Sequence, residues 1–231
     1  MNEKYELTEE FKEIETLREG WLQKIKVYRI RALRAFADVK IGDLGGFVET
    51  KQNLSNMGNA WVYGNAEVYD NARVRDNAWV CGDAEVCGDA EVCNNARVCD
   101  NAEVYDNARV RDNAWVYGNA WVCGDARVCD NAKVYGNAEV CGDAEVYDNA
   151  NIFWCSSIGS RHATTTMFRN KDNGITVTCG CFMGTLEEFA ERVEKEHGEN
   201  IFGKEYKLLI ELAKIHFGLQ DETKGEEENG I

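Results

Sequence analysis

A six-residue repeat dominates the chain, and residues 58–81 show it in four copies: GNAWVY, GNAEVY, DNARVR and DNAWVC. Ala recurs at every sixth position from Ala60 onward. Val does so from Val62 to Val146, and Ile152 continues the Val series. Within each hexad, Ala and Val alternate with variable residues, which is typical of a strand with one buried face. The remaining two residues are Gly, Asp or Asn followed by Asn or Asp, and these types favour tight turns.

Such hexads predict a coil. No segment long enough to reverse the chain separates them, so successive strands cannot form hairpins. Three hexads per turn give a triangular coil of 18 residues, and stacked coils lie about 4.8 Å apart. We therefore expect a mainly β protein in which residues 58–160 form a parallel β-helix. Residues that are 18 positions apart should then lie over one another.

The segment before the repeat predicts a helix, a strand and a cap. Phe11, Ile14 and Leu17 have the spacing of a short amphipathic helix over residues 8–19. Residues 26–33, KVYRIRAL, alternate as a strand does. Residues 41–58 predict an irregular first coil, so residues 1–57 form an N-terminal capping region.

The segment after the repeat predicts a small α+β module at residues 161–219. Strands at 164–168 and 175–181 flank Asn173-Gly174, a strong hairpin signal. Thr185 and Glu188 have the spacing of a capping box, which predicts a helix over 186–197. A second helix is expected near 203–217. The acidic tail at 220–231 has the composition of a disordered segment.

The run DVKIGDLGGFVETKQNLSNMGNAWVYGNA at 38–66 resembles the start of YdcK-like hexapeptide-repeat proteins, which occur in bacteria and prophages. The resemblance covers roughly residues 26–153. It implies that the β-helix is left-handed, and it implies no particular activity. The β-β-α-α segment at 161–219 resembles, more distantly, the C-terminal regions of phage-encoded hexapeptide proteins.

Charge and cysteine content limit the possible binding partners and the cellular compartment of the protein. The net charge is −15, and residues 58–153 contribute 17 acidic and 7 basic side chains. Such a body repels nucleic acid and suits a partner with a basic groove. The sequence has neither a transmembrane-length apolar run nor a signal-peptide core, so no membrane association is expected. Seven of the ten cysteines occupy one repeat position that also takes Tyr or Arg. We therefore expect a reduced protein in the bacterial cytoplasm.

Stacking the coils gathers aromatic and cationic residues on one of three faces. Stacked rings with cations suit a partner protein or a planar, nucleotide-like anion. Exposed rows of Trp also favour self-association, so a homo-oligomer, either a dimer or a trimer, is the preferred expectation and a host protein or nucleotide-like ligand the alternative. The candidate binding residues are Trp61, Trp79, Arg97, Trp115 and Lys133 before Val, with Tyr63, Tyr117 and Tyr135 after it.

The other two faces are dominated by charge. The third combines Arg and Glu, in the order Arg73, Glu91, Arg109, Arg127 and Glu145. Residues 65–80 recur at 101–116, an offset of two coils, so part of this sorting is historical. The second face has Glu67, Glu85, Glu103, Trp121 and Glu139.

No residue set predicts catalysis, a metal or a cofactor. Carboxylates stack at one corner, but solvated acids are the preferred interpretation because a calcium-binding nonapeptide pattern is absent. Cys179 and Cys181 lack a second Cys or His pair to complete a zinc site. Hexapeptide acyltransferases, which this repeat resembles, use a histidine on a coil loop. Here His162, His197 and His216 all follow the repeat.

The leading hypothesis is a non-catalytic binding or inhibitory protein of phage or prophage origin, with anti-defence activity as its preferred form. It rests on the acidic, loop-free solenoid and the separate C-terminal module. One alternative is an acyl- or nucleotidyltransferase-like enzyme with His162 as base. Another is a structural component of a phage.

Overall fold

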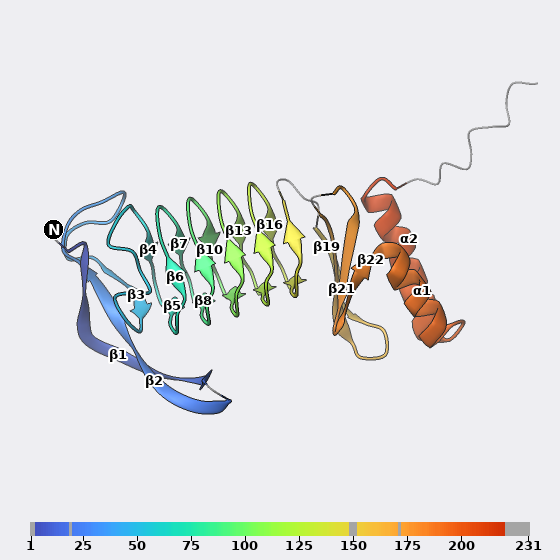
Figure 1. Cartoon of the computed structure of the whole chain (residues 1–231), viewed down its shortest axis with the longest axis horizontal. Coiled ribbons are helices and arrows are strands. Elements are labelled where there is room, and N and C mark those ends of the chain that lie inside the picture. Colours follow the sequence, from blue (N-terminus) through green and yellow to red (C-terminus); the bar gives the residue numbers. More distant parts are fainter. Residues whose placement is uncertain (1–2, 19, 148–151, 171, 220–231) are drawn as a thin grey trace, which may run out of the picture. The chain divides into compact units, whose positions relative to one another are not determined.

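The computed structural model describes residues 3–18, 20–147, 152–170 and 172–219. The chain divides into two compact units, one of residues 1–150 and 170–172 and one of residues 151–169 and 173–231 (Figure 1). The first unit holds the solenoid and the N-terminal segment. The acidic tail at 220–231, expected to be disordered, lies outside the described residues.

The hexads form the predicted parallel β-solenoid of about six turns. Each hexad contributes one two-residue strand, and the four residues between successive strands include the two corner residues (Figure 1). The left-handed sense implied by the resemblance stays a prediction. The strands are β4 (Trp61–Val62), β5 (Glu67–Val68), β6 (Arg73–Val74), β7 (Trp79–Val80), β8 (Glu85–Val86), β9 (Glu91–Val92), β10 (Arg97–Val98), β11 (Glu103–Val104), β12 (Arg109–Val110), β13 (Trp115–Val116), β14 (Trp121–Val122), β15 (Arg127–Val128), β16 (Lys133–Val134), β17 (Glu139–Val140) and β18 (Glu145–Val146).

The strand register confirms the 18-residue coil. Trp61 pairs with Trp79 in parallel register, and every later coil continues the pattern. The first face is the sheet β4-β7-β10-β13-β16, and the third face is β6-β9-β12-β15-β18. The second face, β5-β8-β11-β14-β17, belongs to an eight-stranded sheet that starts with β1, β2 and β3.

Ala and Val fill the interior of the coils. Each repeat Ala and Val from Ala60 to Val146 is buried. Removing one Val side chain from water contributes about 1.5 to 3 kcal/mol to stability. Because every coil contributes such residues, the stacked coils share one continuous core. At the corners, the first residue has a positive φ, as at Asp70 (55°) and Gly82 (74°). The second corner residue often forms amide ladders, for example from Asn95 Nδ2 to Asn113 Oδ1 at 3.1 Å.

The N-terminal segment forms a long hairpin, so the helix predicted at 8–19 is wrong. Strand β1 (Tyr5–Arg18) pairs antiparallel with β2 (Trp21–Ala32), which includes most of the strand predicted at 26–33. Opposite charges face each other across the pair, as Glu13 does Lys26. Such pairing stabilises strands and overrides the helical spacing. We call residues 5–32 the arm.

Strand β3 (Leu44–Val48) connects the arm to the solenoid. It pairs antiparallel with β2 and parallel with β5, so the irregular first coil predicted at 41–58 is present. Gly46 is needed here because a Cβ at that position would lie 2.5 Å from the carbonyl oxygen of Ala66.

The second unit is an antiparallel sheet with two helices. Its strands are β19 (Ile152–Ile158), β20 (Ala163–Arg169), β21 (Ile175–Cys179) and β22 (Phe182–Thr185). Ile152 belongs to this sheet, so extending the repeat to it was wrong. The strand predicted at 175–181 is shorter than expected, because β21 ends at Cys179 and Cys181 lies in the following turn.

Both predicted helices are present. Helix α1 (Leu186–His197) begins with the predicted capping box of Thr185 and Glu188, and α2 (Ile201–His216) follows it. Phe189, Val193 and Tyr206 pack in one core with residues of β20 and β21. In the described part of the chain, neither helix is long and apolar enough to cross a membrane.

Candidate functional site

The structure brings the predicted aromatic and cationic residues onto one face, which we call the aromatic–cation face. It consists of the exposed side of β7, β10, β13 and β16 with the tyrosines that follow two of these strands. Trp115 and Tyr135 are about 40% exposed. Its residues are Trp79, Arg97, Trp115, Lys133, Tyr117 and Tyr135.

Trp61 and Tyr63 lie in the first hexad of the solenoid, where residues of the N-terminal region contact them. Trp61 is only 1% exposed, since its ring packs 6.1 Å from Tyr5 and 5.3 Å from Phe36 between ring centroids. The Tyr63 hydroxyl donates to Asp38 at 2.8 Å, and burial raises the pKa of this phenol. The prediction that Trp61 lines a binding surface is therefore wrong, although it stands in the predicted register.

The cations on this face lie against its aromatic rings. The Arg97 guanidinium is 4.7 Å from the Trp79 ring and 4.8 Å from the Trp115 ring, and the Lys133 ammonium is 5.7 Å from the latter. Beside them, the rings of Tyr117 and Tyr135 stack at 5.6 Å. Each cation–π contact contributes about 0.5 to 1 kcal/mol at an exposed site. These contacts therefore hold the side chains of the aromatic–cation face in place, while Trp115 and Tyr135 stay partly exposed.

Two pairs of repeat cysteines form disulfides. Cys81 joins Cys99 on the first face, and Cys123 joins Cys141 on the second. Their Cα atoms are 4.6 Å apart, as successive coils dictate, which is within the range for a disulfide. The expectation that the repeat cysteines are all reduced is wrong for these four.

A second surface was not predicted: the arm packs along the second face near its start. Lys12 pairs with Glu67 at 2.7 Å and also donates to the carbonyl oxygen of Asn65 at 3.3 Å. Ile14 and Ile25, which are paired across the arm, pack against the cluster that contains Tyr69. The signal was the alternation of Lys12, Ile14, Thr16 and Arg18, which strand geometry places on one side.

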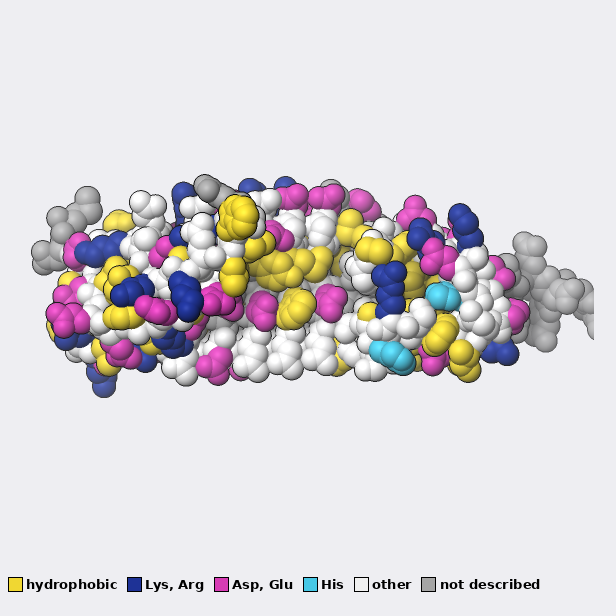
Figure 2. Space-filling view, turned by 90° about the horizontal axis from the view of Figure 1, so that it is seen from below, with side chains coloured by type: hydrophobic (Ala, Val, Ile, Leu, Met, Phe, Trp, Pro, Cys, Tyr) yellow, Lys and Arg dark blue, Asp and Glu magenta, His cyan; other side chains and the backbone are white. Residues whose placement is uncertain are grey.

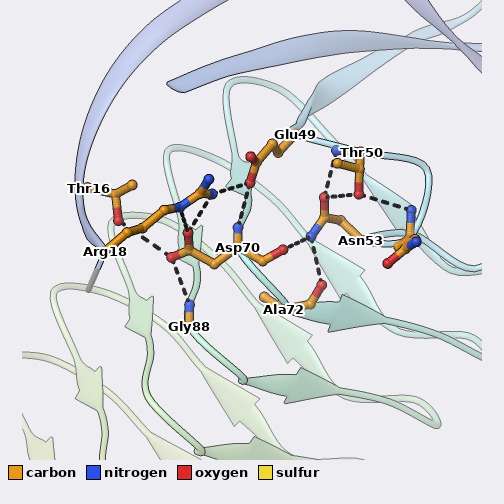
Figure 3. Close-up of polar contacts among 9 residues, drawn as sticks. Thr16, Arg18, Glu49, Thr50, Asn53, Asp70, Ala72 and Gly88 are labelled. Atoms are coloured by element: carbon orange, nitrogen blue, oxygen red, sulfur yellow. Dashed lines mark hydrogen bonds and ion pairs between the residues drawn. The ribbon is translucent and has the colours of Figure 1, made fainter. Parts of the chain in front are cut away.

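Arg18 anchors the end of the arm (Figure 3). Its Nε donates to Asp70 at 2.7 Å, and its Nη2 donates to Glu49 at 2.5 Å. The same Asp70 carboxylate accepts from the backbone N–H of Gly88 in the next coil at 3.3 Å. The hydrogen bonds to Glu49 and Asp70 raise the pKa of the Arg18 guanidinium above its usual value. The contacts fix the arm at a corner of the solenoid.

The tip of the arm is apolar and exposed. Leu17, Trp21 and Leu22 are 70%, 76% and 66% exposed. Figure 2 shows hydrophobic side chains flanked by acidic ones in the middle of the solenoid, beyond the arm. The second face is therefore covered at its start and open farther along.

The column of corner carboxylates is satisfied by neighbouring side chains. Asp76 pairs with Arg75 at 3.0 Å, and Asp112 pairs with Arg111 at 3.7 Å. Asn94 stands between the two acids and donates to Asp112 at 2.7 Å. Among the described residues, no group of three or more His, Cys, Asp or Glu side chains is arranged to hold a metal ion.

The second unit contains a cavity of about 170 Å³ lined in part by Arg161, Cys179, Arg192, His197 and Tyr206. The Cys179 sulfur lies 3.8 Å from the Tyr206 hydroxyl, and burial raises the pKa of Tyr206 to about 12. The ring of His197 packs 5.7 Å from that of Tyr206. These contacts give Cys179 a packing role.

Comparison with known families agrees with this geometry. The model of the YdcK β-solenoid repeat matches residues 66–82 and residues 102–118. These two stretches of the solenoid are similar to the YdcK β-solenoid repeat. The two YdcK-like matches are 36 residues apart, which is two coils. No curated protein matches the chain.

Proposed function

We propose that this chain is a non-catalytic binding protein that contacts its partner through the aromatic–cation face. The observation that supports the proposal is the position of Arg97 between the rings of Trp79 and Trp115. Trp, Tyr and Arg are the side chains most enriched at binding hot spots. The cation–π and stacking contacts already hold these side chains in place. Binding would therefore order few additional rotamers, and this lowers the entropic cost of association.

The favoured partner is a second copy of the chain, and a host protein is the alternative. Stacked exposed aromatics on a regular face suit an isologous contact, in which the same patch serves both copies. A foreign partner would instead carry carboxylates that reach Arg97 and Lys133 on the aromatic–cation face.

The test compares two double variants of the full chain. Trp115→Ala with Tyr135→Ala removes exposed rings from the face, and Arg73→Ala with Arg109→Ala alters the third face as a control. Sedimentation measures the oligomeric state, and capture from bacterial lysate measures foreign partners. We expect the first variant alone to lose association. If both variants associate as strongly as the parent chain does, the proposal is rejected.

A narrower form of the proposal is that the chain comes from a phage or prophage and inhibits a bacterial defence protein. Its support is the net charge of −15, which suits a partner with a basic surface. Expression of the chain in bacteria that carry defined defence systems tests this form. We expect the chain to restore plaque formation by a phage that the defence system blocks, and the Trp115→Ala and Tyr135→Ala variant to lose this effect. Unchanged resistance in every strain would contradict this form of the proposal.

A further inference from the structure

Part of the surface that holds the arm occurs twice in the solenoid. Residues 65–80 and 101–116 are identical at all 16 positions. The first copy contains the arm's partners Asn65, Glu67, Tyr69 and Asp70. We call these four residues the first docking site. We call the corresponding residues the second docking site: Asn101, Glu103, Tyr105 and Asp106.

The two docking sites have the same local structure. Asp70 and Asp106 have φ values of 55° and 59°, and each accepts a hydrogen bond from the glycine N–H of the next coil. Glu67 and Glu103 both lie in strands of the second face, in the same parallel register. Because the backbone repeats, the side chains of the second site start from the same positions as those that bind the arm.

Burial differs between the two sites because the arm covers only one of them. Tyr69 is 5% exposed, whereas Tyr105 is half-buried. Asp70 is half-buried, whereas Asp106 is exposed. Glu103 pairs with no cation among the described residues. Partial burial and the nearby Glu85 raise the pKa of its carboxyl, and an incoming cation would oppose both effects by stabilising the charged form.

From this duplication we propose that the second docking site binds an extended basic–aliphatic strand of a partner protein, with the pattern Lys-x-Ile-x-Thr-x-Arg that the arm itself uses. The cations would pair with Glu103 and Asp106, and the aliphatic side chain would cover Tyr105. This contact is independent of the aromatic–cation face.

Two features favour a foreign strand over the arm of a second copy. An arm from another copy would first have to leave its own site, where it is tethered and has a high effective concentration. In addition, the floor differs. Phe47 lies beside Glu67 and carries Lys12 and Arg29 over its ring, each at 4.3 Å, whereas Glu85 takes the equivalent place beside Glu103. The next coil also differs, since Glu85 follows Glu67 whereas Trp121 follows Glu103. The surroundings of the second site are therefore not matched to the arm of this chain.

The probe for this site is a synthetic hairpin of residues 9–28, with added terminal cysteines joined so that the strands stay paired. Fluorescence anisotropy measures its binding to the full chain, in which the chain's own arm occupies the first site. We expect one hairpin per chain, with affinity that falls as salt is added because ion pairs carry the contact. Changing Lys12→Glu and Arg18→Glu in the hairpin should abolish binding.

Two chain variants with the same charge change locate the site. Glu103→Gln with Asp106→Asn should weaken binding by roughly tenfold or more, which corresponds to about 1.4 kcal/mol. Glu91→Gln with Asp112→Asn, on the third face and at a corner, should leave the affinity unchanged. Circular dichroism checks that both variants fold. Absence of binding, or equal loss in both variants, would overturn the proposal.

A further outcome would replace the partner. If the unmodified chain self-associates more tightly than it binds the hairpin, and the Glu103→Gln and Asp106→Asn variant abolishes this association, the occupant is a second copy. That result would refute a foreign strand. It would leave the aromatic–cation face to be judged by its own variants.

Discussion

Asp70 and Asp106 occupy equivalent corners two coils apart, yet of these two acids only Asp70 binds an arginine among the described residues. The difference follows from the arm, which reaches the first of the two corners. One backbone geometry therefore serves as an intramolecular anchor at one level of the solenoid and stays open at another.

The anchor can be tested by local stability. Asp70→Asn should weaken the contact of Arg18 and speed hydrogen exchange in β1 and β2, because a partly exposed charged pair contributes about 1 kcal/mol. Exchange measured by mass spectrometry reports the opening of the arm. The same substitution at Asp106 should leave exchange in the arm unchanged. Equal exchange in the two variants would show that Asp70 does not hold the arm.

The corners give a prediction about backbone strain. A Cβ added at Gly82, where φ is 74°, would lie 2.9 Å from backbone atoms of Asp100 in the next coil. Gly82→Ala should lower the free energy of unfolding by about 1 to 3 kcal/mol. Asp100→Gly, at the corner above, should change it by less. Denaturant titrations of both variants provide the measurement, and similar losses would contradict this account.

The disulfides give a prediction about redox conditions. Cys81→Ser combined with Cys99→Ser should lower the free energy of unfolding by about 3 kcal/mol, since the bridge closes a loop of 18 residues. Thermal unfolding with and without reductant measures the effect. Cys87→Ser, which changes a cysteine that is not bridged, should respond to reductant as the parent chain does. A parent chain whose stability is insensitive to reductant would refute a stabilising role for the bridges.

Lys4 gives a prediction about pH. Burial lowers the pKa of its ammonium to about 8, with Arg34 adding to the effect, while Nζ donates to the carbonyl oxygen of Ala60 at 2.8 Å. The unfolded chain, with a pKa near 10.5, then binds more protons between pH 8 and 10.5. The contribution of Lys4 to stability should therefore rise with pH over this window, by at most about 1.4 kcal/mol per unit.

Comparison with Lys4→Met isolates this effect. The difference in unfolding free energy between the parent chain and the variant should move in favour of the parent from pH 7.5 to pH 9.5. The tyrosines near Lys4 are present in both proteins, so their titration cancels to a first approximation. A difference that is constant over this range would contradict a lowered pKa for Lys4.

The solenoid was predictable because one short period determines it. Ala60 and Val62 define both the buried face and the register, so the stacking of Trp79 over Trp61 followed from sequence alone. The C-terminal capping box was equally local, since Thr185 and Glu188 satisfy each other's backbone donors. Features that depend on neighbours within a few residues are readable from the pattern.

The arm was not predictable in the same way. Phe11, Ile14 and Leu17 fit a helix, and only long-range contacts such as Lys12 with Glu67 select the strand. The burial of Trp61 also depends on distant partners, because Tyr5 and Phe36 cover it. The sequence placed the candidate face correctly but not its limits, which depend on where the N-terminal segment folds back.

The identity of residues 65–80 and 101–116 has a consequence for how such proteins change length. A unit of two coils contains its own core, its own corners and one set of the four docking-site residues. Duplicating that unit would lengthen the rod by about 10 Å without disturbing the register of its neighbours. Each duplication would also add one more such set, so the valency of the protein would grow in step with its length.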